Sequence, residues 1–235
     1  VCSSDLASTL TIGGAGFDGV TPANNTVTLD DGATGTVTAA TATSLTVSFG
    51  TKPVAAGPLS AVVVNGGGSS GAAVQVAKVV PVVTASTSNV PVTTTSLTIN
   101  GFGFSTTEAS NSVTLSSGTA TVTGATNTQL TVSVSGLSLG ALTAQVTSNG
   151  QSSGAAVQVA TLVVGPPSTM AVNPGSTPQT ATFSTGFAMP LAVTVRDGAN
   201  NPVSGVDVTF TAPLGGASAV FSNSLPAIKI GRAHV

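Results

Sequence analysis

The sequence predicts an all-β chain built from tandem β-sandwiches, and three observations support this prediction. Val and Thr, whose branched side chains favour strands, recur throughout the chain. The 28 Gly and 13 Pro residues fit a fold with many turns. The chain also repeats itself, because residues 69–77 recur unchanged as residues 152–160. No window has a sustained helical periodicity, so we expect the regular structure to consist of strands.

The internal repeat covers most of residues 7–163. Residues 10–17 resemble residues 97–104, and residues 25–29 resemble residues 111–115. The two copies differ in length only between these matched blocks, where loops are expected. A repeat of about 85 residues that contains several short strands has the size of one β-sandwich.

Each copy is predicted to contain short strands in which apolar and polar residues alternate. In the first copy these are residues 36–39, 45–49 and 61–64, and in the second copy they are residues 113–115, 119–123, 130–134 and 142–146. Asp-Gly and Asn-Gly dipeptides adopt positive φ at low cost and favour tight hairpin turns. Such dipeptides occur at residues 31–32, 65–66 and 149–150.

The pattern changes after Pro167. Residues 191–197 and 206–210 are predicted strands, and residues 198–202 are predicted to form a turn between them. This third module ends near Phe221, short of a full sandwich. The domains expected from these boundaries are sandwiches at residues 7–80 and 81–163 and a truncated domain at residues 164–228. The connector at residues 79–84 contains proline and is expected to be extended and semi-rigid, and a second junction lies at residues 163–167.

The two ends of the chain are interpreted as library sequence rather than as protein. A DNA strand that encodes residues 1–6 has a reverse complement that encodes residues 230–235, and it resembles a short-read sequencing adapter. We therefore exclude residues 1–6 and 229–235 from fold reasoning, as for any fusion scar. The sole Cys and the sole His, Cys2 and His234, lie in these segments. The parent gene is expected to extend beyond both ends.

The composition excludes several classes of partner. Charged residues make up 5% of the chain, against roughly 25% in an average soluble protein. The net charge is -2 and the basic residues do not cluster, which argues against nucleic acid and against an electrostatic membrane anchor. No stretch approaches the roughly 20 apolar residues of a membrane-spanning helix, so no membrane contact is expected within this fragment.

A dinucleotide-binding pattern, G-x-G-x-x-G, occurs at residues 14–19. That pattern requires a following helix whose N-terminus holds the pyrophosphate, but residues 20–25 are expected to form a loop. The second copy lacks the third glycine. We interpret the motif as a glycine turn that lets Phe17 and Phe104 enter the core, and we expect the eight Phe residues to be core residues in general. No cofactor is expected.

A nucleophile-elbow pattern, G-x-S-x-G, occurs at residues 67–71 and again at residues 150–154. A serine nucleophile needs a base to accept its proton, and no His remains once His234 is set aside. Both segments are therefore predicted to be Ser/Gly hairpin loops. We expect no catalytic residue and no enzymatic activity.

The carboxylates were considered as a glycosidase pair and as calcium ligands. They are Asp18, Asp30, Asp31, Glu108, Asp197 and Asp207, together with Asp5 in the excluded N-terminal segment. The chain has no Trp or Tyr to form a sugar platform, which argues against a glycosidase. Residues 30–32 and 197–201 are interpreted as ordinary turns, with calcium at a domain junction left as the alternative, and zinc is excluded for lack of His and Cys. No metal site is therefore assigned.

Two families resemble parts of this chain. A strand followed by Gly-x-Gly-Phe, Asn-x-Val-Thr-Leu, Leu-Thr-Val and a final turn with Ser-Ser resembles the IPT/TIG domain over residues 8–79 and 95–163. The pattern of residues 191–221 resembles the group 1 bacterial immunoglobulin-like domain of invasins and intimins. These resemblances imply tandem immunoglobulin-like β-sandwiches arranged as an elongated array.

The resemblances imply a non-catalytic structural or adhesive module of a secreted or surface-displayed bacterial protein, acting as a stalk or spacer and in cell adhesion. The expected partners are a surface ligand, either protein or polysaccharide, and neighbouring domains of the same chain. The alternative is an accessory module of a secreted hydrolase that binds or positions carbohydrate. A transcription factor is a third reading, which the missing basic patch disfavours. The expected location is extracellular or on the bacterial cell surface.

Overall fold

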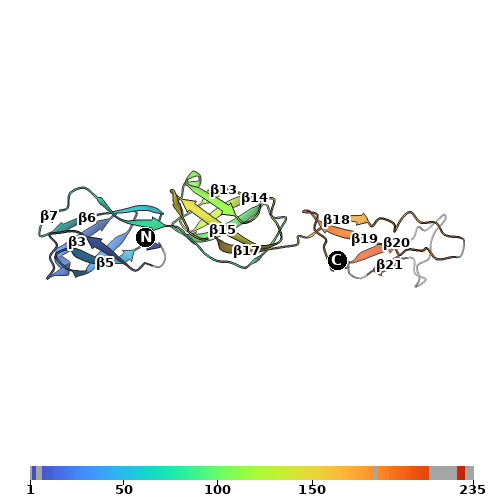
Figure 1. The fold of residues 1–235 in the computed structure, drawn as a ribbon, viewed down its shortest axis with the longest axis horizontal. Coiled ribbons are helices and arrows are strands. Elements are labelled where there is room, and N and C mark those ends of the chain that lie inside the picture. Colours follow the sequence, from blue (N-terminus) through green and yellow to red (C-terminus); the bar gives the residue numbers. More distant parts are fainter. Residues whose placement is uncertain (1, 4–6, 183–184, 212–226, 231–235) are drawn as a thin grey trace. The chain divides into compact units, whose positions relative to one another are not determined.

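The computed structural model describes residues 2–3, 7–182, 185–211 and 227–230. The chain divides into two compact units, Val1–Asn89 with Thr94–Thr161 and Val90–Thr93 with Leu162–Val235, and each unit is described by itself. Apart from two three-residue 3-10 helices, every regular element of the described residues is a strand, which confirms the predicted all-β class (Figure 1). No helix in the described part has the length and hydrophobicity needed to cross a membrane.

The first sandwich contains two sheets. One sheet has the order β1-β8-β6-β3, with β7 beside β6, and the other has the order β2-β5-β4. This pairing is that of the immunoglobulin fold, in which the third, sixth and seventh strands face the second, fifth and fourth. The strands are β1 (Cys2–Ser3), β2 (Thr9–Gly13), β3 (Asn25–Leu29), β4 (Thr34–Ala40), β5 (Ser44–Thr51), β6 (Gly57–Asn65), β7 (Gly68–Ser69) and β8 (Val74–Val80).

The second sandwich repeats this pairing, as the sequence repeat predicts. Its sheets have the orders β10-β17-β15-β12, with β16 beside β15, and β13-β14-β11-β9. A register shift after Val37 in β4 recurs after Val122 in β13, whereas the shift between Thr34 and Gly35 occurs in β4 alone. The strands are β9 (Val82–Val83), β10 (Asn89–Pro91), β11 (Ser96–Phe102), β12 (Asn111–Leu115), β13 (Thr119–Ala125), β14 (Gln129–Ser135), β15 (Gly140–Ser148), β16 (Gln151–Ser152) and β17 (Val157–Val163).

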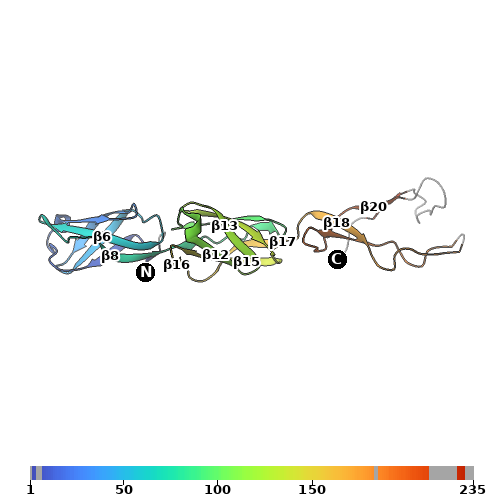
Figure 2. The ribbon, with the colours of Figure 1, turned by 90° about the horizontal axis from the view of Figure 1, so that it is seen from above.

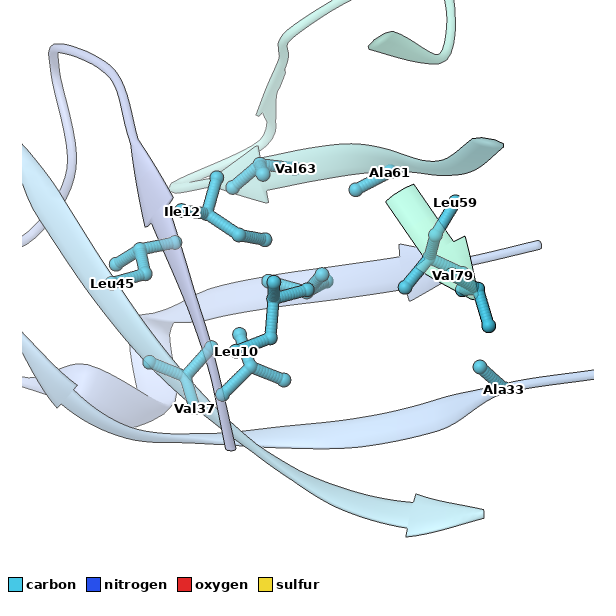
Figure 3. Close-up of a cluster of buried hydrophobic side chains, with 11 residues drawn as sticks. Leu10, Ile12, Ala33, Val37, Leu45, Leu59, Ala61, Val63 and Val79 are labelled. Carbon is cyan, nitrogen blue, oxygen red and sulfur yellow. The ribbon is translucent and has the colours of Figure 1, made fainter. Parts of the chain in front are cut away.

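Each core forms because successive side chains on a strand point to opposite faces of the sheet. In β2 this alternation buries Leu10 and Ile12 and exposes the residues between them. Leu45, Val47 and Leu59 are fully buried against them. Figure 3 shows how side chains from both sheets meet in this cluster. In the edge-on view of Figure 2, β6 and β8 lie side by side on one face of the first sandwich.

One of the three predicted hairpin turns is displaced. Asn149 and Gly150 have positive φ and join β15 to β16 in a hairpin, as predicted. Asp31 and Gly32 also have positive φ, but they connect β3 to β4, which lie in different sheets, so the prediction of a hairpin there is wrong. In the first copy, however, Asn65 is the last residue of β6 and pairs with Gly68, so Gly66 and Gly67 form the turn. The prediction of an Asn65-Gly66 turn is therefore wrong by one residue. Two consecutive glycines accept positive φ as readily as Asn-Gly does.

The connector between the two sandwiches is extended, as predicted, but it is not a separate linker. Val79 belongs to β8 and Val83 to β9, and both side chains are buried together with Pro81. A proline fits here because its missing N–H falls between two strands, where no ladder hydrogen bond is needed.

Two pairs of strands form in the described residues of the second unit that follow β17. β18 (Pro167–Val172) pairs with β19 (Val193–Asp197), and β20 (Val208–Thr211) pairs with β21 (Ala227–Ile230). The predicted strands at residues 191–197 and 206–210 are thus found with shifted ends, and Asn200 has the positive φ of a turn residue. Strand β21 lies beyond Phe221, where the third module was expected to end.

The segments set aside as library sequence are described only in part. The backbone of Cys2 and Ser3 pairs with Val79 and Val80, and Ile230 ends β21. The adapter origin of these segments stays a prediction. Residues 1, 4–6 and 231–235 lie outside the described residues, as do His234 and Phe221.

Candidate functional site

A buried asparagine holds the glycine-rich loop of the second sandwich. Asn111 is the first residue of β12 and is 7% exposed. Its Oδ1 accepts a hydrogen bond from the Ser105 N–H at 3.1 Å, and its Nδ2 donates to the carbonyl oxygens of Ser105 and Thr107 at 2.8 and 3.0 Å. One side chain thereby satisfies three backbone groups that no strand ladder reaches.

The first sandwich has the same arrangement around Asn25. Its Oδ1 accepts from the Asp18 N–H at 2.9 Å, and its Nδ2 donates to the carbonyl oxygens of Asp18 and Pro22. The roles of Asn25 and Asn111 were not among the sequence predictions. The signal was present, because each opens the repeated Asn-x-Val-Thr-Leu segment.

The carboxylate of Asp18 caps the turn that follows it. Hydrogen bonds from the Thr21 N–H, the Asn24 Nδ2 and the Val20 N–H hold the pKa of Asp18 below its ordinary value. The matching position in the second sandwich is Ser105, whose Oγ accepts from the Thr107 N–H at 3.2 Å. The same turn is therefore built once with a carboxylate and once with a hydroxyl, as expected of a structural acceptor.

The G-x-G-x-x-G motif at residues 14–19 is not followed by a long helix. The next element is η1 (Pro22–Asn24), a single turn of 3-10 helix, whereas binding a pyrophosphate requires the amides at the N-terminus of an α-helix. Phe104 is fully buried, as predicted, while Phe17 is only half-buried against the core. The prediction that the phenylalanines are core residues in general is wrong for Phe102 and Phe187, which are 43% and 53% exposed.

The two G-x-S-x-G serines accept hydrogen bonds within their own hairpin loops. Ser69 Oγ accepts from the Gly71 N–H, and Ser152 Oγ accepts from the Gly154 N–H, both at 3.1 Å. The serine that follows each of them accepts from the N–H of Val63 or Val146 at 3.0 Å. No histidine lies among the described residues. This geometry is that of a turn and not that of a nucleophile paired with a base.

The carboxylates of Asp30 and Asp31 also accept hydrogen bonds from backbone N–H groups. Asp30 Oδ1 accepts from the Ser60 N–H at 2.8 Å, and Asp31 Oδ2 accepts from the Ala55 N–H at 2.9 Å. Glu108 opens the 3-10 helix η2 (Glu108–Ser110). Within the described part of the chain, no three His, Cys, Asp or Glu side chains come together in a group that could hold a metal ion.

Asp197 is the most buried carboxylate of the described residues, at 2% exposed. Burial raises its pKa, but hydrogen bonds from the N–H groups of Gly165, Asn201 and Ala199 and from the Asn201 side chain outweigh burial and hold the pKa below the ordinary value. Every one of these contacts lies within the second unit. The carboxylate therefore fixes both the 198–201 turn and the start of β18.

Protonation of Asp197 is expected to destabilise the second unit. The pKa of Asp197 is lower in the folded state than in the unfolded state, so the ionised carboxylate stabilises the folded state. This stabilisation is complete above the unfolded pKa of about 3.9 and is lost as the pH falls through the folded pKa. In Asp197→Asn an amide group that donates replaces one of the two carboxylate oxygens, both of which accept from backbone N–H groups. We therefore expect a lower midpoint of thermal unfolding at neutral pH. The difference from the wild-type chain should shrink below about pH 4.

Amide-resolved thermal unfolding by NMR, followed at Val195 and Asn201, measures this difference. Asp18→Asn is the matched control, because Asp18 also has a lowered pKa but lies in the first unit. A midpoint difference between wild type and Asp197→Asn that stays constant from pH 7 to pH 3 would contradict the assigned role.

The pairing of the strands and the use of the polar side chains together define a class of protein: an all-β chain of repeated immunoglobulin-like sandwiches whose motif residues build turns. No protein-family model matches the chain, and no curated protein is similar to it. Solved structures match it at TM-scores below 0.5.

The Escherichia coli adhesin FdeC is 22% identical, with 91% of this chain and 82% of that chain covered at a TM-score of 0.38. InvD of Yersinia pseudotuberculosis is 17% identical, with 99% and 81% covered at a TM-score of 0.30. SGBP-B of the Bacteroides ovatus mixed-linkage glucan utilization locus, solved with a mixed-linkage heptasaccharide, is 18% identical, with 77% and 48% covered at a TM-score of 0.26. These similarities concern the fold alone.

Proposed function

We propose that this chain is a non-catalytic structural and adhesive module of a secreted or surface-displayed bacterial protein. In this proposal residues 7–80 and 81–163 are IPT/TIG-like sandwiches, residues 164–228 are a bacterial immunoglobulin-like domain, and the terminal segments derive from a sequencing adapter. The module acts as a stalk or spacer and presents its surface to a protein or polysaccharide ligand.

The proposal rests on the hydrogen bonds that the potentially reactive side chains make. The catalytic and metal-binding motifs contain serines and carboxylates. These side chains accept hydrogen bonds from backbone N–H groups. Side chains that hold the backbone in this way serve the fold and not a substrate. The same arrangement also occurs twice, in two sandwiches, which is typical of a repeated structural element.

We expect the purified full chain to hydrolyse p-nitrophenyl esters no faster than its Ser69→Ala/Ser152→Ala variant. The variant removes both candidate nucleophiles and is the matched control. A wild-type rate clearly above that of the variant would overturn the non-catalytic assignment.

Retention on immobilised polysaccharides separates the stalk from the carbohydrate-binding alternative. A stalk or spacer should pass through columns of cellulose, chitin and mixed-linkage glucan without delay. Specific retention, released by the free oligosaccharide, would instead favour the accessory module of a hydrolase.

A further inference from the structure

A pocket opens between the two sheets of the first sandwich. Its volume is about 340 Å³, and no charged residue lines it. Val74, at the start of β8, is one of its lining residues and is 61% exposed. The lining residues are the end of β2 with the adjoining loop, parts of β6 and β8, and Phe17 and Ser70. Together with the β8 edge at residues 74–78, we name this surface the acceptor groove.

The same place in the second sandwich is closed, although the segment of β8 that lines the pocket recurs there unchanged. Residues 69–77 and 152–160 are identical, yet Val159 is 5% exposed and Ala160 is fully buried, whereas their counterparts Val76 and Ala77 are half-buried. Phe104 is fully buried where Phe17 is not. Because residues 69–77 and 152–160 are identical, the different burial of this segment comes from what surrounds it. Two other lining residues, Gly13 and Ala15, are replaced by Asn100 and Phe102 in the second copy.

A crossing segment closes the second sandwich. The Thr84 N–H donates to the Asn100 carbonyl at 2.8 Å, on one sheet, and the Ser86 N–H donates to the Gln158 carbonyl at 2.8 Å, on the other. The segment then runs along β17, where the Thr161 N–H donates to the Ser88 carbonyl at 2.9 Å.

The counterparts of the two bridged residues line the acceptor groove. By the sequence repeat, Asn100 corresponds to Gly13 and Gln158 to Gln75, and both Gly13 and Gln75 line the pocket. In the first sandwich β1 reaches only Val79 and Val80 of β8. Within the described residues, no strand pairs with residues 74–78 on that side.

We propose that the acceptor groove binds an extended, uncharged peptide segment of the same chemistry as residues 82–88. The segment adds parallel to β8 and crosses to the end of β2, as residues 84–88 do on the second sandwich. Main-chain hydrogen bonds supply the affinity, and the apolar pocket selects the side chains, as in β-strand addition generally. An uncharged segment is selected because a charge placed in this pocket would have no partner. This inference does not depend on the surface role proposed above.

The test uses the full chain labelled with ¹⁵N and the capped peptide of residues 82–88, Val-Val-Thr-Ala-Ser-Thr-Ser. We expect the peptide to shift the amide signals of residues 74–78 and Phe17 and to leave those of residues 157–161 in place. A second variant repeats residues 82–88 ahead of Val1, which raises the effective concentration of the segment. Its amides at residues 74–78 should exchange more slowly than those of the original chain.

Val74→Asp and Val20→Asp form a matched pair of variants, because both side chains are exposed and only Val74 lines the pocket. Val74→Asp should weaken peptide binding by about tenfold or more, since it places an unpaired carboxylate beside the segment, and Val20→Asp should not. Unchanged signals with both the peptide and the extended variant would overturn the proposal. Self-association of the chain that Val74→Asp abolishes, without any effect of the peptide, would overturn it in favour of a second copy as the occupant.

Discussion

Phe104→Ala is expected to lower the free energy of unfolding of the second sandwich by about 3 to 5 kcal/mol. The ring is fully buried, and a Cβ on Gly101 would lie only 2.4 Å from its tip. Removing the ring leaves a cavity, and the surrounding strands, which are held by ladder hydrogen bonds, can relax into it only partly. The free-energy cost of the remaining cavity adds to the lost transfer free energy of the ring.

Phe17→Ala is the matched variant in the first sandwich. Its ring is half-buried beside the open pocket, so we expect a loss of about 1 kcal/mol. Amide exchange of Ile99 and Leu130 for one sandwich, and of Ile12 and Leu45 for the other, measures each free energy separately. Equal losses for the two variants would contradict the difference in packing.

Asn111→Ala is expected to cost about 2 kcal/mol, the second largest effect. The buried carbonyl oxygen of Ser105 loses its donor, and an unsatisfied buried acceptor costs about 1 to 3 kcal/mol. The carbonyl oxygen of Thr107 still accepts from the Ser110 N–H. The Ser105 N–H keeps one partner, because Ser148 Oγ also accepts from it at 2.9 Å. The loss should therefore be smaller than that of Phe104→Ala.

Asn100→Ala is the control for Asn111→Ala. Asn100 is exposed, and its Oδ1 accepts from the Gln129 side chain on the surface, so its removal should stay within about 0.5 kcal/mol. Chemical denaturation followed by circular dichroism, together with amide exchange at Leu130, measures both variants. A loss for Asn111→Ala no larger than that for Asn100→Ala would show that the loop does not depend on this side chain.

Sequence patterns located the strands well and their ends less well. Alternation placed residues 45–49 in β5 and residues 130–134 in β14, because one face of each strand must be buried. The turn at residues 65–66 was placed one residue early, since Asn-Gly and Gly-Gly are equally good turn pairs and only the strand register chooses between them. Exposed Phe102 was missed because composition does not show to which face of β11 a side chain points.

The sequence predicts turns at the candidate motifs, because the groups that catalysis needs do not accompany them. The glycine and serine motifs were read as turns because no helix and no base accompany them, and the hydrogen bonds of Ser69 and Ser152 support that interpretation. The role of Asn25 and Asn111 was not predicted. They bond to backbone groups three to seven residues away, across loops whose paths the sequence pattern does not determine.

The sequence by itself determined that this chain is all β, that it repeats, and where its strands and glycine turns lie, because these follow from local preference and the period of two. Only the tertiary structure decided that two identical nine-residue segments, 69–77 and 152–160, have different environments. Burial depends on what packs against a strand: residues 84–88 cover one copy, while the other copy lines an open pocket.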